Sequence, residues 1–288
     1  MKGVRRNAAI NIAGNLVPMF AAVLAMPMLL GGLGAARMGI FTLALGLFGF
    51  AGIFDLGIGR ALTRSIAHYS QLGTAARRIA PLLKTGLVVV LLMGVTWAVL
   101  LSAAADWLLA HVSTLGAGLR AESHAGLMIL AAMIPVALLS TSLLGTLEGL
   151  QQFGRSNAIR VPVGVATFLV PALVAQVAPT LVAVIGALAL VRLAGMVALL
   201  VAVASQIPLL ARRDEESLPT APMWRYTGWL TISNIVGPLM VYGDRYYLAT
   251  LLPPAAVSYY TVPMDTIFRA TSLPGAALGA AFPALTRA

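Results

Sequence analysis

The sequence predicts an all-α protein whose helices cross a membrane about eight times, and two observations support this prediction. Of the 288 residues, 60% are hydrophobic and only 10% are charged, whereas a soluble domain has about 45–50% apolar and about 25% charged residues. The apolar residues also come in unbroken blocks, such as the charge-free stretches 7–36, 85–105 and 161–191. Because lipid offers no partner to an open backbone, we expect these blocks to be transmembrane helices.

The expected spans follow these blocks in order along the chain. Each is long enough, at about 20 apolar residues, to cross the hydrocarbon core of a bilayer. We place them at 8–31, 38–59, 85–105, 123–147, 160–178, 180–206, 226–250 and 256–282. The chain starts like a signal peptide, with Lys2, Arg5 and Arg6 before an apolar run. That run is too long for a signal sequence, so we interpret it as a retained first helix.

The basic charge of the chain, formally +10, is explained better by membrane topology than by nucleic-acid binding. With the spans placed as above, fourteen Lys and Arg residues fall on one side of the membrane, and Arg37 and Arg120 on the other. The cation-rich side is expected to be cytoplasmic. We therefore expect a multi-pass inner-membrane protein with a cytoplasmic N-terminus. It would contact membrane lipids, including anionic ones, and have no nucleic-acid partner.

Metal, cofactor and enzymatic chemistry are not expected from the residues present. The chain has no cysteine. Its three histidines, His68, His111 and His124, lie in predicted loops or at span ends and do not share a metal-ligand spacing. The predicted loops contain no pair of carboxylates in a catalytic arrangement. The sequence also lacks the glycine-rich motif followed by Lys and Ser or Thr that binds phosphate groups. We expect no cofactor, no metal and no catalytic residues.

The domain organisation is predicted from one linker and one repeat. Charges and prolines mark 207–225 as a cytoplasmic linker, which separates a first lobe of six helices (1–206) from 226–288. A shift of 219 residues aligns Asn15 with Asn234, Leu33 with Leu252 and Thr42 with Thr261. Both copies run in the same direction, as in a parallel repeat. We therefore expect 226–288 to be the first two helices of a second lobe. The chain is either a complete protein with eight spans or, as we favour, a shortened one that lacks spans nine to twelve.

Several motifs resemble those of a known transporter family. They are Asn11-Ile-Ala-Gly-Asn15, Phe54-Asp55-Leu56-Gly57-Ile58-Gly59-Arg60-Ala61-Leu62 and Tyr242-Gly243-Asp244-Arg245. The chain is similar to the polysaccharide biosynthesis transporters, the O-antigen and oligosaccharide-lipid flippases of the multidrug/oligosaccharidyl-lipid/polysaccharide (MOP) superfamily. The resemblance implies a two-lobed bundle of twelve to fourteen helices that moves a lipid-linked sugar across the membrane. It also implies a lipid-linked oligosaccharide as substrate, with a polysaccharide polymerase and other assembly proteins as partners.

Charged residues inside the predicted spans are candidates for function, because each costs about 2.5–3.5 kcal/mol at the centre of a membrane helix. Arg192 lies about 18 Å along its span by the rise of a helix. Its side chain either pairs with an acidic residue or faces a cavity, where the guanidinium group would bind a pyrophosphate through two hydrogen bonds. Asp265 and Arg269 are one turn apart and are expected to pair. Arg245 either extends its head group to the membrane surface or binds substrate.

The remaining polar candidates also have two interpretations each. Arg60 and Arg64 serve topology or collect an anionic head group at a cavity mouth. Asn11 and Asn15 either form hydrogen bonds between helices or bind sugar hydroxyls. The candidate substrate-binding residues are Arg192, Arg269, Arg245, Arg60, Arg64, Asn11 and Asn15. The candidate ion-coupling or gating residues are Asp55, Asp244 and Asp265.

Together these features predict a flippase that moves a polyprenyl-pyrophosphate-linked oligosaccharide, an O-antigen or exopolysaccharide repeat unit, by alternating access. Two other functions remain open at this point. A cation-coupled multidrug exporter of the same superfamily would favour carboxylates without arginine neighbours in mid-membrane. A membrane-embedded sugar or lipid transferase would need carboxylates at a metal or on a large external loop.

Overall fold

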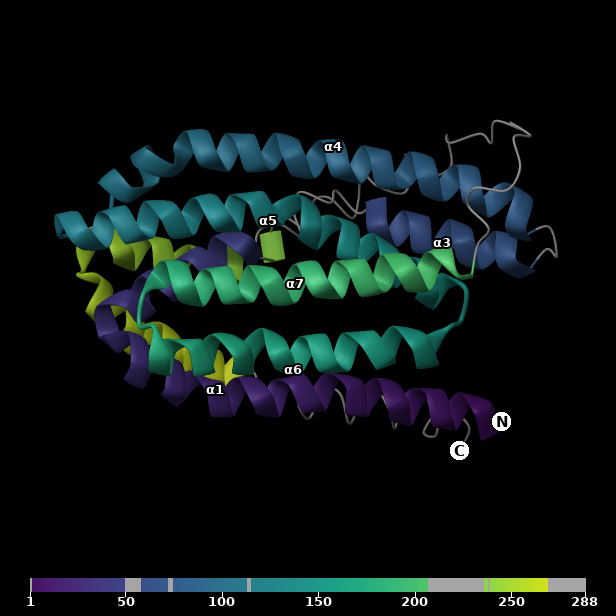
Figure 1. Ribbon diagram of the computed structural model, residues 1–288, viewed down its shortest axis with the longest axis horizontal. Helices are drawn as coiled ribbons and strands as arrows, with labels where there is room; N and C mark the ends of the chain where they lie inside the picture. Colours follow the sequence, from purple (N-terminus) through teal and green to yellow (C-terminus); the bar gives the residue numbers. More distant parts are fainter. Residues whose placement is uncertain are drawn as a thin grey trace.

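The structure, a computed structural model, describes residues 2–49, 58–71, 75–112, 115–206, 236–237 and 239–268, which are helical apart from short turns and caps. The elements are α1 (Lys2–Gly49), α3 (Ile58–Gln71), α4 (Ala75–Ala110), α5 (Ala117–Gly149), α6 (Phe153–Val177) and α7 (Leu181–Ala204), followed by helices 239–251 and 254–268. The long helices lie side by side in an elongated bundle (Figure 1). The all-α prediction is confirmed.

The helices have the length and the surface of membrane spans. Five helices of the described part are long and apolar enough to cross a bilayer. Large apolar side chains also face outward on α4 and α7, where Leu92 and Val99 are 61% and 62% exposed and Leu190 and Val201 are 69% and 64% exposed. Such a surface is unfavourable in water and is matched by lipid. The chain is therefore a multi-pass membrane protein.

The two spans predicted at 8–31 and 38–59 appear as the two arms of α1. Between them, Gly34 has φ 74° and ψ 164°, which is not helical. Glycine adopts this backbone conformation easily because it has no Cβ. The chain changes direction here (Figure 1), so the predicted turn is a sharp kink without an intervening loop. The second arm is described only as far as Gly49.

Residues 58–71 form α3, where the sequence analysis expected only a loop between two spans. The helix is amphipathic. Its apolar residues Leu62 and Ile66, one turn apart, are fully buried, and α3 packs against α4 and α5. The loop prediction was wrong because the 3.6-residue period of a helix gives this short basic segment one apolar face, although it contains no long apolar run.

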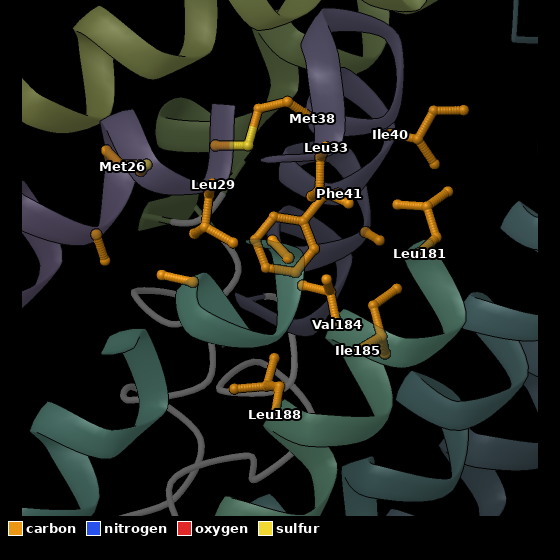
Figure 2. Close-up of a cluster of buried hydrophobic side chains, with 14 of the residues drawn as sticks. Met26, Leu29, Leu33, Met38, Ile40, Phe41, Leu181, Val184, Ile185 and Leu188 are labelled. Carbon is orange, nitrogen blue, oxygen red and sulfur yellow. The ribbon is translucent and has the colours of Figure 1, made fainter. Parts of the chain in front are cut away.

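Two features hold the first-lobe helices (α1–α7) together. Phe41 of α1 packs among Leu29, Val184, Ile185 and Leu188, so that both arms of α1 share a core with α7 (Figure 2). At the same end of the bundle, the guanidinium of Arg37 donates to both carboxylate oxygens of Glu122 at 2.9 and 2.8 Å. The backbone N–H of Leu181 donates to the same carboxylate. The pair thus joins α1, α5 and α7 at the end predicted to be outside.

Candidate functional site

A polar cavity lies inside the first lobe, between α3, α5, α6 and α7. It has a volume of about 610 Å³. Its lining includes two arginines, one carboxylate and several hydroxyl groups among apolar residues; the polar and aromatic members are Thr63, Ser140, Thr141, Glu148, Arg160, Thr167, Phe168 and Arg192. Polar groups in a membrane bundle are costly and are therefore candidates for binding.

Arg192 and Arg160 bring two positive charges to this cavity. Arg192 is the twelfth residue of α7 and is half-buried, which agrees with the mid-depth position predicted for it. Arg160, near the start of α6, donates to the Asn157 side chain at 2.7 Å and lies 3.6 Å from the Glu148 carboxylate. One carboxylate and two guanidinium groups thus line the cavity, and the charged residues of this lining carry a net positive charge.

The hydroxyl groups that line the cavity donate hydrogen bonds to backbone carbonyls of their own helices. Ser140, Thr141 and Thr167 each donate to the carbonyl four residues earlier, at 2.7, 3.0 and 2.7 Å. Thr63 does the same with Gly59 at 2.9 Å. Their oxygen lone pairs remain as acceptors. The lining therefore offers cationic donors from arginine and neutral acceptors from hydroxyls.

A second polar cluster joins helices 239–251 and 254–268. Arg245 donates to both oxygens of Asp265, one of them at 3.2 Å, and its guanidinium lies 5.0 Å from the centre of the Tyr242 ring. Tyr260 donates to the carboxylate of Asp244. Adjacent residues on a helix point about 100° apart, so Asp244 and Arg245 reach different partners on the neighbouring helix.

This cluster contradicts one of the two interpretations given for Arg245, and substrate binding stays a prediction. The side chain does not extend to the membrane surface: only 3% of it is exposed, and it forms a bidentate ion pair. The physical reason is that Asp265 neutralises the charge inside the bundle, and such a pair costs less than either charge alone. The partner predicted for Asp265 was Arg269, which lies outside the described residues; its described partner is Arg245.

Among the remaining candidates, the structure describes the side chain of Arg64 alone. Arg64 is exposed on α3. Asn11 and Asn15 lie on α1 and Arg60 lies on α3, but only their backbone is described. Asp55 and Arg269 fall outside the described residues, as does the predicted linker 207–225.

Glu148 and Arg160 were not singled out as site residues by the sequence analysis, which counted Arg160 only as a topological cation. A signal was present: an acid and a base lie one on each side of the short turn between α5 and α6. Two helices joined by such a turn are antiparallel neighbours, so their facing ends lie close together.

A second cavity, also about 610 Å³, lies at the opposite end of the bundle and is almost entirely apolar. It is lined by α1, α4, α5 and helix 239–251, with Leu43, Trp97, Trp107 and Tyr246 among its larger residues. It offers few polar groups for a hydrophilic ligand.

The fold is a bundle of membrane-length helices with charged residues buried between them, and solved structures of other membrane proteins share this fold. An inward-facing MATE multidrug-resistance transporter of the MOP superfamily matches with a TM-score of 0.68 at 16% identity, over 94% of this chain and 66% of that one. A MOP-superfamily transporter from Pyrococcus furiosus matches with a TM-score of 0.66 at 14% identity, over 96% and 65%. At such identities the likeness shows the fold alone.

Comparison of the sequence with family models and with other proteins shows the family of this chain. A family model described as "Polysaccharide biosynthesis protein" matches residues 4–288, and this chain belongs to that family. A Shigella flexneri protein named "Putative O-antigen transporter" is 26% identical over 281 residues, covering 98% of this chain. The chain spans 66% of the length of that relative.

Proposed function

We propose that this protein moves a polyprenyl-pyrophosphate-linked oligosaccharide from the cytoplasmic to the outer leaflet of the inner membrane. The observation that carries this proposal is the first-lobe cavity, where Arg160 and Arg192 outnumber the single carboxylate of Glu148. An anionic head group would be attracted by the excess positive charge. Sugar hydroxyls would donate to the oxygens of Ser140, Thr141 and Thr167, whose own protons are already used.

The family supports the same cargo. Its model is described by polysaccharide biosynthesis, and the Shigella flexneri relative is named for O-antigen transport. A membrane-embedded transferase finds less support, since the described residues hold no group of three or more acids or histidines that could bind a metal ion. A drug exporter finds less support as well. A cationic drug would bind to carboxylates that have no partner, whereas Asp265 accepts hydrogen bonds from Arg245 and Asp244 accepts one from Tyr260.

Transport would proceed by rocking of the two lobes around the cargo, with the lipid tail remaining in the bilayer. Arg192, Arg269 and Arg60 would attract the pyrophosphate, and Arg245 would do so only after its ion pair with Asp265 opens. An ion or proton gradient acting through Asp55, Asp244 or Asp265 would supply the driving force. A polysaccharide polymerase would receive the cargo on the outer side.

The first test is Arg192→Ala, with polymer export as the readout. Loss of a hydrogen bond to a charged group costs about 1.5–3 kcal/mol, which corresponds to a roughly 10- to 100-fold lower rate. Arg155→Ala is the matched control, because Arg155 is exposed near the start of α6. We expect export to fall for Arg192→Ala and to remain normal for Arg155→Ala at equal protein levels. Normal export in both variants would contradict the site.

A further inference from the structure

The two lobes meet in a narrow seam at the end of the bundle predicted to face outside. Across it, Thr42 and Thr261 share a hydrogen bond of 3.0 Å, with both residues buried. Tyr246 donates to the backbone carbonyl of Leu43 at 2.8 Å. Gly39 lies so close to Pro254 that an added Cβ would stand 1.8 Å from the Pro254 carbonyl oxygen. These contacts close the space between the second arm of α1 and the second-lobe helices.

The seam lies on the symmetry axis of the internal repeat. Thr42 and Thr261 are 219 residues apart, which is the shift that aligns the two copies. When a residue touches its own equivalent, the two-fold axis that relates the copies passes between them, as in an isologous dimer interface. The structure thus places the axis of the repeat at this hydrogen bond.

The neighbouring residues show the reciprocal packing that such an axis requires. Leu43 of the first lobe packs with Ala249 and Val257 of the second. Its repeat equivalent is Val262, which packs in the opposite direction, against the first-lobe cluster that contains Phe41. Each lobe therefore inserts the same position of its repeat into the other.

The described hydrogen bonds across the seam join neutral groups, whereas the first lobe has an ion pair at the same end in addition to its apolar core. The hydrogen bonds Thr42–Thr261 and Tyr246–Leu43 join uncharged groups, and such bonds each contribute about 0.5–1.5 kcal/mol. The Arg37–Glu122 pair, in contrast, fixes α1 to α5 within the first lobe. Parting the seam would leave the ion pair of the first lobe and that of the second lobe intact.

We propose that this seam is a gate on the axis of the repeat, closed by the Thr42–Thr261 contact and opened when the lobes part at the outer end. The proposal rests on the proposed transport function. It adds where the outer closure lies, which residues make it, and that the closure is built from equivalent positions of the two copies. Opening also removes one wall of the apolar cavity, because Tyr246 and Ala249 belong to its lining.

The natural absence of cysteine allows a direct test of the closed contact. In the double variant T42C/T261C, the two introduced cysteines carry the only thiols of the chain and replace threonines whose hydroxyl oxygens lie 3.0 Å apart. We expect oxidation to join them, because the side-chain oxygens that the sulfur atoms replace already lie 3.0 Å apart and an S–S bond is about 2.05 Å long. The readout is loss of labelling by a polyethylene-glycol maleimide, recovered with a reductant. T63C/T261C is the control and is expected to stay reactive, since Thr63 lies on α3.

Opening is tested without reference to any cargo. In the single variant T42C, expressed in its own membrane, a membrane-impermeant maleimide added outside is expected to label the thiol as the seam opens. Gly39→Ala should increase the labelling severalfold, because its Cβ cannot fit beside Pro254. Gly31→Ala is the matched control on the same helix, since nothing lies within 4 Å of its added Cβ.

The outcomes separate the gate from the transport function. Failure of T42C/T261C to cross-link would overturn the closed contact, and an unlabelled T42C in cells that export polymer would overturn its opening. Cross-linking that leaves export unchanged would also overturn the gate. A seam that cross-links, opens and responds to Gly39→Ala in a protein that moves no saccharide lipid would leave the gate standing and refute the proposed cargo.

Discussion

At the scale of single residues, the charged side chains show what a sequence can and cannot predict. Arg192 was predicted at mid-depth from the helical rise alone, because that position depends only on the start of its span. The partner of Arg245 could not be predicted. It depends on which face of helix 254–268 is turned toward helix 239–251, and Asp265 lies 20 residues away. Whether Arg192 binds substrate remains a prediction.

The Arg245–Asp265 pair gives a test at this scale. Arg245→Ala is expected to destabilise the protein by about 3–5 kcal/mol, because it leaves an uncompensated carboxylate inside the bundle. Replacing both partners, as in R245M/D265L, should restore most of the lost stability, since an apolar pair of similar volume has no charge to desolvate. Thermal unfolding in detergent measures both. Equal stability of Arg245→Ala and the natural protein would show that the pair is not formed.

At the scale of helices, the positions of the spans were predictable and the way they approach one another was not. Apolar blocks located α4 to α7, closely for α7 (181–204 against the predicted 180–206) and less closely for α4, which begins at 75 and not at 85. The direction of the helices across the membrane stays a prediction. The missed helix α3 has scattered apolar residues, of which Leu62 and Ile66 are fully buried, so a search for long apolar runs passes over it. Close approaches also depend on small residues whose partners lie far along the chain, as with Gly94 of α4 and Pro135 of α5.

That approach leads to a prediction for the packing of α4 on α5. In Gly94→Ala the new Cβ would lie 2.6 Å from the Pro135 Cα. A backbone atom cannot move aside cheaply, so we expect a loss of about 1–3 kcal/mol, as for an overpacked core. Gly186→Ala on α7 is the control, with nothing within 4 Å of its added Cβ. Unfolding in a denaturing detergent compares them, and equal stability would contradict the described contact.

At the scale of the whole molecule, the repeat connects the sequence to the arrangement of the lobes. The sequence alone aligns Thr42 with Thr261 through a shift of 219 residues, and in the structure these two residues share a hydrogen bond. The pattern could predict that two like-oriented lobes exist. It could not predict that these two positions touch, because the location of an axis depends on how the lobes pack. The division at 207–225 remains a prediction.

The transport of a saccharide lipid is the central proposal and is tested most directly by translocation in reconstituted vesicles. The protein is placed in liposomes with a fluorescent polyprenyl-pyrophosphate saccharide, and the rate at which the saccharide becomes accessible on the opposite face is measured. We predict a rate well above that of protein-free vesicles, reduced roughly 10- to 100-fold by Arg192→Ala and unchanged by Arg155→Ala. A rate equal to that of protein-free vesicles, with correctly folded protein present, would contradict the proposed function.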